Sequence, residues 1–512
     1  MGQPANAIEL KDITKRFGKV VANDKINLSV RKGEILSVLG ENGSGKTTLM
    51  NMLSGIYFPD EGQIFVNGEE VTITSPRASF ALGIGMIHQH FKLVDILTAA
   101  ENIILGLPGK EVLDMTGVTA KIREVIDKYG FDLDPGQKIY EMSVSQKQTV
   151  EIVKVLYRGA NLLILDEPTA VLTPQETEKL FNVLRNMRKD GCSIIIITHK
   201  LHEVLAISDR VAVLRKGRYI GTVETGEATA ESLTEMMVGK KVTLNIDRPE
   251  PVDPVRRLKI EGLSCVNIEG VKTLDCADFE AYGGEILGIA GIAGSGQKEL
   301  LEAIAGLQRI SAGTVTYYPP DGAETVLTEK TAEDIRDLGI RLSFVPEDRL
   351  GMGLVASMDM VDNMMLRGYN KGRGFFADRK TPKELAEQII MRLEVATPDV
   401  STPVRRLSGG NVQKVLVGRE IAANPTVLMV AYPVRGLDIN SSYTIYHLLN
   451  EQKEKGVAVI CVGEDLDVLL ELCDKILVLC GGKITGIVDG RTTTKEEIGL
   501  LMTKYKGEAG HE

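Results

Sequence analysis

The chain has 512 residues, of which 43% are hydrophobic and 25% are charged, and its formal net charge is −10. This composition is typical of globular proteins, and the length predicts about two to four domains. The negative charge argues against general binding to nucleic acids or anionic lipids, the N-terminus lacks the apolar core of a signal peptide, and no apolar run is long enough to span a bilayer. The six cysteines form no C-x-x-C pair and show no metal-ligand spacing, which indicates a reduced, cytosolic protein.

A glycine-rich loop follows the first strongly apolar segment of the chain. Residues 34–39 are apolar and lack a helical period, which predicts a buried strand, and residues 46–53 contain no Gly or Pro, which predicts a helix. Between them, residues 40–47 fit the phosphate-binding pattern G-x-x-x-x-G-K-[ST] in the setting that this pattern requires. We therefore expect the loop amides and the helix N-terminus to bind phosphate, Lys46 to reach the β- and γ-phosphates, and Thr47 to ligate Mg²⁺.

Strand and helix patterns alternate through the following residues. Residues 64–66 predict a strand and residues 177–189 an amphipathic helix, whereas residues 162–165 and 194–197 are continuous apolar strands. Such strands are typical of a mainly parallel sheet that is covered on both faces, with its binding site at the carboxyl ends of the strands. The segment from about residue 99 to residue 143 has more helix signals and predicts a helical subdomain.

Polar residues that suit hydrolysis follow two of these strands. Asp166 and Glu167 end the strand at residues 162–165, where Asp166 is placed to hold Mg²⁺, directly or through water, and Glu167 to polarise an attacking water as a general base. His199 follows the strand at residues 194–197, so parallel pairing would bring it to the same edge of the sheet, in position to contact the γ-phosphate.

The chain is an internal repeat. Residues 33–40 recur as residues 284–291, and Ser143 has a counterpart at Ser408. Two copies of one domain are the simplest explanation. Three prolines within residues 247–254 predict an extended, semi-rigid connection between the copies. The predicted organisation is a first domain over residues 1–245, a linker over residues 246–256 and a second domain over residues 257–512.

The order of these motifs resembles that of ATP-binding cassette (ABC) ATPases, and the resemblance covers nearly the whole chain, twice. The motifs that carry it are the phosphate loop, Gln89, Ser143-x-x-Gln146, the pair Asp166-Glu167 and His199. The resemblance implies an α/β fold with two tandem P-loop ATPase domains. Each domain would combine a mainly parallel core sheet with helices, an antiparallel β part and a helical subdomain.

The resemblance also implies a set of site residues, with ATP and Mg²⁺ as cofactors. In this set Phe17 stacks on adenine, and Gln89 senses Mg²⁺ and communicates with a membrane partner. The catalytic residues would be Glu167, His199, Gln89 and Lys46; the metal-binding residues would be Thr47, Gln89 and Asp166; and the nucleotide-binding residues would be Phe17, Gly40, Glu41, Asn42, Gly43, Ser44, Gly45, Lys46, Thr47, Thr48, Ser408, Gly409 and Gly410.

The second copy departs from the family pattern at most of these positions. The replacements are Gln297 for Lys46, Lys298 for Thr47, Glu347 for Gln89, Ala431 for Asp166, Tyr432 for Glu167 and Glu464 for His199. Its signature segment, residues 407–411 (Leu-Ser-Gly-Gly-Asn), is intact, whereas residues 142–146 of the first copy (Met-Ser-Val-Ser-Gln) lack both glycines. In ABC ATPases two cassettes close head to tail, and the phosphate loop of one meets the signature of the other. The resemblance therefore implies one complete hydrolytic site and one impaired site per chain.

A fused double cassette of this length resembles the ATPase subunits of importers for simple sugars and nucleosides. Residues 86–91, 98–102 and 172–176 favour the nucleoside branch, with a purine-type nucleoside as cargo. The resemblance implies two polytopic permease subunits as partners, an extracytoplasmic substrate-binding lipoprotein that acts indirectly, no nucleic acid, and a peripheral location at the cytoplasmic face of the cell membrane.

Two alternatives belong to other functional classes. A soluble twin-cassette protein that acts on ribosomes or DNA usually keeps both sites intact and has a longer, charged linker, and this chain also lacks the zinc cysteines of the repair ATPases. A regulatory scaffold that binds ATP without turnover conflicts with the complete set formed by Lys46, Asp166, Glu167 and His199.

Overall fold

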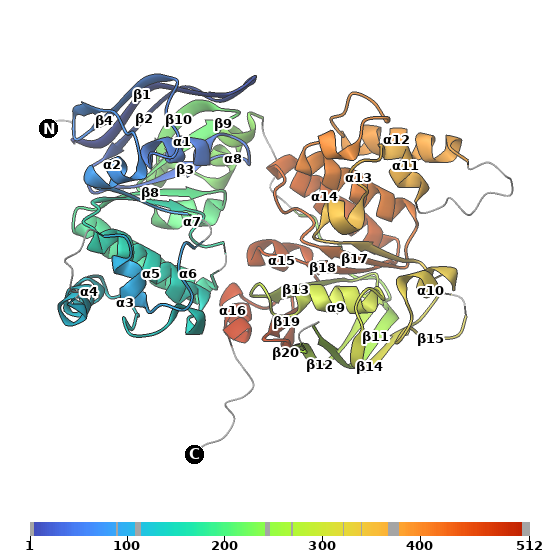
Figure 1. Cartoon of the computed structure of the whole chain (residues 1–512). Coiled ribbons are helices and arrows are strands. Elements are labelled where there is room, and N and C mark those ends of the chain that lie inside the picture. The colour runs from blue at the N-terminus through green and yellow to red at the C-terminus, as the bar shows by residue number, and fades with distance from the viewer. Residues whose placement is uncertain are drawn as a thin grey trace, which may run out of the picture. The chain divides into compact units, whose positions relative to one another are not determined.

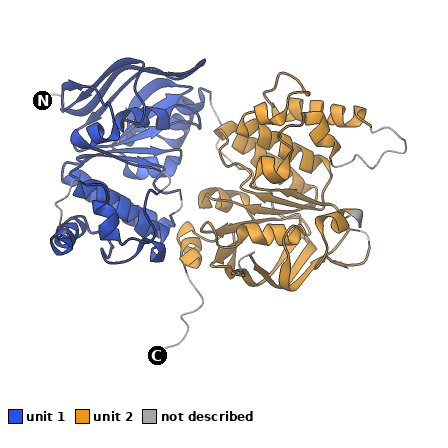
Figure 2. Cartoon of the chain, in the orientation of Figure 1, with its two compact units in different colours: residues 1–243 blue, residues 244–512 orange. Residues whose placement is uncertain are grey.

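The computed structural model describes residues 5–88, 91–107, 114–170, 172–240, 246–267, 270–320, 322–338, 340–366 and 378–503. The chain divides into two compact units, Met1–Thr243 and Leu244–Glu512 (Figure 2). Within the described residues, each unit contains one six-stranded and one four-stranded sheet. These sheets and the helices around them confirm the predicted fold of two tandem α/β domains.

Unit 1 follows an alternating order of strands and helices (Figure 1). Its strands are β1 (Asn6–Phe17), β2 (Val20–Arg31), β3 (Ile35–Leu39), β4 (Glu61–Val66), β5 (Glu69–Val71), β6 (Ile84–Ile87), β7 (Leu162–Asp166), β8 (Ser193–Thr198), β9 (Arg210–Arg215) and β10 (Arg218–Glu224). Its helices are α1 (Lys46–Leu53), α2 (Pro76–Ala81), α3 (Ala99–Ile104), α4 (Met115–Tyr129), α5 (Val144–Tyr157), α6 (Pro174–Lys189), α7 (Leu201–Ile207) and α8 (Ala230–Val238), with short 3₁₀ turns at Ile139–Glu141 and Thr225–Glu227.

The larger sheet of unit 1 has the strand order β10-β9-β3-β8-β7-β6. All its pairings are parallel except that of β10 with β9, and the smaller sheet, β2-β1-β4-β5, is antiparallel. Every residue of β3 is buried, because both faces of the sheet are covered. Leu36 and Val38 pack with α1 and the antiparallel sheet, whereas Ile35 packs with α3, α4, α5 and α6 on the other face. The carboxyl ends of β3, β7 and β8 therefore open on one shared edge.

Unit 2 repeats this arrangement with its own elements. Its strands are β11 (Val255–Val266), β12 (Lys272–Gly283), β13 (Ile286–Gly291), β14 (Ile310–Tyr317), β15 (Thr325–Val326), β16 (Leu342–Val345), β17 (Val427–Ala431), β18 (Ala458–Val462), β19 (Lys475–Cys480) and β20 (Lys483–Asp489). Its helices are α9 (Gln297–Ile304), α10 (Ala332–Asp337), α11 (Met360–Met365), α12 (Lys380–Leu393), α13 (Gly409–Ala422), α14 (Ile439–Glu454), α15 (Leu466–Leu472) and α16 (Lys495–Thr503), with short helical turns η3 (Arg349–Gly353) and η4 (Val404–Arg406). Its six-stranded sheet has the order β16-β17-β18-β13-β19-β20, which matches unit 1 strand for strand.

In the part of the chain that the structure describes, no helix is both long enough and apolar enough to cross a membrane.

The predicted linker packs on unit 2. Ile246 belongs to the hydrophobic core of that unit, and Asn450 Nδ2 donates a hydrogen bond to the Asp247 carbonyl at 2.6 Å. Lys453 Nζ donates to the Pro249 carbonyl at 2.5 Å and pairs with Asp474 Oδ1 at 2.7 Å. Since the linker covers this pair, the Lys453 and Asp474 side chains are only 2% and 5% exposed. The proline-rich segment is thus an integral part of unit 2.

Unit 1 has the same ion pair without such a cover. Arg188 Nη2 lies 2.5 Å from Asp209 Oδ1, and the two side chains are 44% and 26% exposed. The two aspartates are equivalent because each accepts a hydrogen bond from the first amide of the central strand, Ile35 at 2.9 Å and Ile286 at 2.8 Å.

We expect Lys453→Met to destabilise unit 2 by about 3 kcal/mol, because it removes the 2.7 Å partner of a buried carboxylate and leaves Asp474 with the longer 3.5 Å ion pair to Arg491. Arg188→Met is the matched control in unit 1, and its cost should stay below about 1 kcal/mol because that pair is open to solvent. Hydrogen exchange of the β13 and β3 amides in the full chain measures the two effects separately. Equal destabilisation of the two units would show that the linker does not bury the pair in solution.

Candidate functional site

The phosphate loop connects β3 to α1 as predicted, and two of its glycines cannot be replaced without a clash. A Cβ atom at Gly40 would lie 2.4 Å from the Leu214 carbonyl oxygen, and one at Gly45 would lie 2.4 Å from the Ala22 carbonyl oxygen. Gly45 also has φ 94°, in the left-handed region that favours glycine. Asn23 Nδ2 donates a 3.2 Å hydrogen bond to the Gly45 carbonyl and fixes the turn that begins α1.

Lys46 lies across the inside of this loop. Its side chain is buried, and Nζ donates hydrogen bonds to the carbonyls of Gly40 at 2.6 Å and Glu41 at 2.9 Å. Burial lowers the pKa of Lys46, while the nearby carboxylates of Glu167 and Asp166 act in the opposite direction. The loop therefore holds one cation at its centre, next to the two acids.

The rest of the loop is shaped to receive an anion. The hydroxyl of Ser44 is buried and has no hydrogen-bond partner within the part of the chain that the structure describes. Asn42 and Gly43, at the tip, are exposed, and Gly43 has φ 79°. Thr47 is exposed and Thr48 half-buried at the start of α1, where backbone N–H groups lack intrahelical acceptors. An orphaned buried hydroxyl, a lysine and free amides together fit a polyphosphate.

The acidic pair and the histidine meet at the same edge of the sheet. His199 Nδ1 lies 2.9 Å from Glu167 Oε1, although the two residues end different strands. Glu167 has φ 48°, and its amide donates to the Ile197 carbonyl at 2.8 Å, which turns its side chain away from the path of β7. The Thr47 hydroxyl lies close enough to the carboxylate of Asp166 to lower its pKa, so the two predicted metal ligands are neighbours.

The two carboxyl groups differ in their proton affinity. Burial and, to a lesser extent, the adjacent Glu167 together raise the pKa of Asp166 to about 6, against the opposing effects of Lys46 and Thr47. The hydrogen bond with His199 lowers the pKa of Glu167 and outweighs the effect of burial. Glu167 is therefore the more readily ionised of the two carboxyl groups, which is the state that a general base requires.

Phe17 ends β1 with 44% of its surface exposed. Its ring contacts Tyr57 edge to face, with 5.3 Å between centroids, and Lys15 Nζ lies 5.6 Å from its centroid. One face of an aromatic ring is thereby presented to solvent by a fixed support, as stacking on a nucleobase requires. Gln89, the remaining predicted catalytic residue, lies outside the described residues.

Unit 2 keeps the geometry of this site and loses its chemistry. Gln297 occupies the place of Lys46, is equally buried, and donates from Nε2 to the Ile292 carbonyl at 3.0 Å. Tyr432 has φ 48° and donates its amide to the Val462 carbonyl, as Glu167 does to Ile197. The neighbouring Ala431 offers no carboxylate. A neutral amide and a phenol thus stand where unit 1 has a cation and a base.

The two signature segments also differ in structure. Ser408 begins α13 as its N-cap, with its hydroxyl accepting from the Asn411 amide at 3.4 Å, and both Ser408 and Gly409 are exposed. Ser143 caps α5 in the same way but forms a full capping box with Gln146. The backbone turn is therefore common to both units, and the glycines distinguish them.

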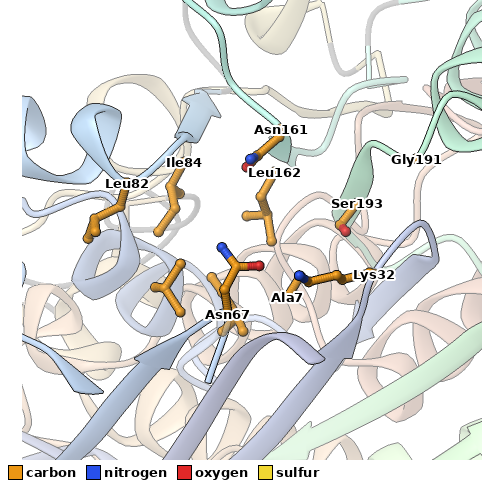
Figure 3. A pocket seen from close by; sticks show the side chains of 11 residues that line it. Ala7, Lys32, Asn67, Leu82, Ile84, Asn161, Leu162, Gly191 and Ser193 are labelled. Atoms are coloured by element: carbon orange, nitrogen blue, oxygen red, sulfur yellow. The ribbon is translucent and has the colours of Figure 1, made fainter. Parts of the chain in front are cut away.

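A cavity of about 120 Å³ lies elsewhere in unit 1 (Figure 3). Lys32, Asn67 and Asn161 line it, beside the first residues of β6, β7 and β8. This is the amino edge of the parallel sheet, opposite the phosphate loop. In unit 2 the equivalent space holds the Tyr317 hydroxyl, 2.6 Å from Thr426 Oγ1. The cavity of unit 1 therefore arises because the side chain at that position is smaller, and it is not part of the hydrolytic site.

The sequence patterns did not reveal three of the residues that shape these sites. Asn23 supports the phosphate loop from β2, far from it in sequence. Arg349 and Arg435 contact the signature and the degenerate site of unit 2. Of the three, only Arg435 could have been found from the sequence, because the repeat aligns it with Ala170 of unit 1 and so shows a cation in place of a small side chain. The two positions have the same backbone turn, in which the Ala170 amide donates to the Glu167 carbonyl and the Arg435 amide to the Tyr432 carbonyl.

Comparison with known proteins gives a consistent result. The ABC transporter family model matches residues 23–170 and again residues 274–433. The chain is 42% identical to a nucleoside import ATP-binding protein of Lactococcus lactis, covering 97% of each chain, and 42% identical to a guanosine import ATP-binding protein of Bacillus subtilis, again covering 97% of each. It is 39% identical to a glucose import ATP-binding protein of Haloferax volcanii, covering 97% of this chain and 95% of that protein.

A solved structure shares the double architecture. The archaeal ribosome recycling factor, in complex with a ribosomal stalk protein, has a TM-score of 0.60 over 93% of this chain and 90% of its own, at 16% identity, which shows likeness of fold alone. The sequence relatives, the matched family model and the phosphate loop agree on one assignment. The chain belongs to the ABC transporter family, as an ATP-binding ATPase with two tandem cassettes.

Proposed function

We propose that this ATPase is the motor of an importer for a small polar solute, and that each chain hydrolyses ATP at one site. The observation that carries this proposal is the arrangement in unit 1, where Glu167 and His199 form a 2.9 Å pair beside the buried Lys46. The equivalent positions of unit 2 hold Tyr432, Glu464 and Gln297 in the same backbone frame. Only unit 1 therefore has the groups that hydrolysis requires.

Each predicted site residue of unit 1 that the structure describes has a role in the proposed reaction. Phe17 stacks on adenine, the amides of residues 40–48 hold the phosphates, and Lys46 turns from the loop carbonyls to the β- and γ-phosphates. Glu167 takes a proton from the attacking water, and His199 holds its carboxylate and contacts the γ-phosphate. Thr47 and Asp166 offer oxygen ligands of the kind that Mg²⁺ prefers, and the ion would neutralise charge on the phosphates.

The glycines of the unit 2 signature support a shared site. A Cβ atom at Gly409 or Gly410 would meet nothing closer than 3.4 Å within the described part of unit 2, and neither glycine has a positive φ. Unit 1 builds the same helix start with Val144 and Ser145. The fold of the unit therefore does not require the two glycines. Close approach of a phosphate explains them, and we infer that Ser408, Gly409 and Gly410 complete the ATP site of unit 1 when the cassettes close.

Both units present a matching apolar surface for a membrane partner. We define this coupling surface as Val94 and Leu105 in unit 1 and Val355 and Leu366 in unit 2, with exposures of 39%, 51%, 39% and 39%. A buried asparagine shapes it in each unit: the side chain of Asn102 accepts from the Val94 amide, and that of Asn363 from the Val355 amide, both at 2.8 Å. Two equivalent apolar surfaces, one on each unit, fit a membrane partner made of two polytopic permease subunits.

The names of the relatives reported above support a proposal for the cargo. Both proteins at 42% identity carry the words nucleoside or guanosine in their names, and the sugar relatives are less similar. We therefore propose a purine-type nucleoside as cargo, with a simple sugar as the alternative, delivered by an extracytoplasmic substrate-binding lipoprotein. The chain would lie at the cytoplasmic face of the cell membrane. A function on ribosomes is the less favoured candidate, because its only support is a likeness of fold at 16% identity.

Co-expression with polytopic permease subunits tests the motor assignment. The wild-type chain should sediment with membranes only when the permeases are present, and the double variant Leu105→Glu and Leu366→Glu should lower the bound fraction about tenfold, because it places charges on the coupling surface. Met391→Glu is the matched control, since Met391 is 74% exposed on α12 outside that surface. Co-sedimentation of the wild-type chain with ribosomes in preference to permease-containing membranes would reject the proposal.

Uptake by the assembled transporter tests the cargo. Membranes that contain the permeases, the receptor and this chain should take up guanosine in an ATP-dependent manner and should leave ribose outside. Uptake of ribose without guanosine would assign the transporter to the sugar branch.

A further inference from the structure

The degenerate site of unit 2 contains a cavity of about 390 Å³ with an acidic lining. Its wall includes Lys298, Glu302, Glu347, Asp348, Ala431 and Tyr432. Lys298, which stands in place of the metal-binding Thr47, lies 3.8 Å from Glu302. With three carboxylates in the wall and Gln297 in the lysine position, this cavity is poorly suited to a polyphosphate.

Arg435 joins the three segments that a nucleotide would otherwise bring together. Its guanidinium forms ion pairs with Glu347 and, at 3.2 Å, with Glu464, and it lies 5.8 Å from the centroid of the Tyr432 ring. These three residues stand at the unit 2 positions of Gln89, His199 and Glu167. In unit 1 the position of Arg435 is Ala170, so unit 2 has a half-exposed cation at a position where unit 1 has a small apolar side chain.

Arg349 extends this cluster to the signature. Its Nη1 donates to the Gly409 carbonyl at 3.1 Å, and its Nη2 donates to the Arg435 carbonyl. Arg349 lies in η3, within a segment that is three residues longer between Glu347 and Val355 than between Gln89 and Val94. The contact is therefore an addition that unit 1 does not share. The two arginines form a continuous path from the degenerate cavity to the first residue of α13.

We propose that Arg349 and Arg435 take the place of a nucleotide in unit 2 and hold residues 408–410 in their working position at all times. Both are positioning residues, and the proposal rests on the proposed function in one respect, that residues 408–410 act on ATP held by unit 1. The loss of hydrolytic groups in unit 2 is thereby matched by new groups that keep its signature in place. Unit 1 would then bind and hydrolyse the nucleotide, while residues 408–410 of unit 2 would keep the same position throughout.

Hydrogen exchange on the nucleotide-free full chain tests the positioning. In Arg349→Met, the amides of residues 411–414 should exchange about tenfold faster, the factor expected when one charge-assisted hydrogen bond is lost at a helix start. Arg435→Met keeps the carbonyl that Arg349 binds but loses the ion pairs to Glu347 and Glu464 that fix its loop, so the same amides should also exchange faster. The equivalent amides 146–149 of unit 1 should not change. Arg256→Met is the matched control, because Arg256 pairs with Glu280 at 2.8 Å on the surface of the same unit. Unchanged exchange at residues 411–414 in both variants would overturn the proposal.

Turnover in the assembled transporter tests the consequence. Each arginine variant should lower kcat about tenfold, with the KM for ATP within twofold of wild type. The kcat of the double variant should be no lower than that of the less active single variant, because the two arginines act through one path. Arg435→Lys, which can serve only one of the two glutamates, should fall between. If kcat is unchanged while Ser408→Arg is inactive, the positioning role is wrong and the shared site stands. If Ser408→Arg is active, the shared site is wrong, and the exchange result alone decides whether the arginines hold the signature.

Discussion

Glu167→Gln is expected to bind Mg²⁺-ATP and to hydrolyse it at least about a hundredfold more slowly than the wild-type chain in the assembled transporter. The carboxylate lies 2.9 Å from His199 and is the more easily ionised of the two acids at this edge. An amide of the same size keeps a hydrogen bond to the histidine but cannot accept a proton from water. The loss should therefore fall on kcat and leave ATP affinity within a fewfold.

Tyr432→Phe is the matched control for this experiment. Tyr432 has the backbone conformation of Glu167 at the equivalent position of unit 2, and the ring that packs beside Arg435 is retained. Turnover of this variant should stay near the wild-type value. If Glu167→Gln keeps turnover within a fewfold of wild type, another group must activate the water.

The sequence predicted the fold well where the determinants are local. The short apolar runs that became β3, β7 and β8 and the glycine pattern that became the loop need only their own residues to be recognised. The helix expected at residues 177–189 begins at Pro174, because Thr173 and Glu176 form a capping box and proline suits the first helical turn. Parallel pairing then brings His199 to Glu167, as expected from strand order.

Contacts between distant residues limited the prediction of the rest. The linker was expected to be extended and semi-rigid, and the sequence did not show that Lys453 and Asn450, about 200 positions later in the chain, bind its carbonyls. The path from Arg435 through Arg349 to Gly409 joins three loops, and none of these residues stands in a pattern with a known period. Such contacts follow from the packing of the whole unit, so composition and spacing do not reveal them.

Ser408→Arg is expected to abolish turnover about as fully as Lys46→Ala, although the two residues belong to different units. The serine is exposed at the start of α13, and a bulky cation there would fill the space that the γ-phosphate needs. It would also remove the Ser408 hydroxyl, which donates a hydrogen bond to the charge on the γ-phosphate in the transition state, and one such donor is worth about 3–4 kcal/mol. Isolated Ser408→Arg should retain the thermal stability of the wild-type chain, because an exposed N-cap contributes only about 1 kcal/mol.

Equivalent changes in the impaired site should have little effect. Ser143→Arg alters a segment that already lacks both glycines, and Gln297→Ala removes an amide that binds only the Ile292 carbonyl among the described residues. Both variants should keep most of the wild-type turnover. Retained turnover in this pair excludes general damage as the reason for the losses at Lys46 and Ser408.

We infer that each chain has one hydrolytic site, formed by the phosphate loop of unit 1 and the signature of unit 2. The ATPase rates of Ser408→Arg and Ser143→Arg, measured side by side in the assembled transporter, decide whether the site is shared in this way. Ser408→Arg should be inactive, and Ser143→Arg should retain most activity. Loss of activity in Ser143→Arg together with normal turnover in Ser408→Arg would contradict it.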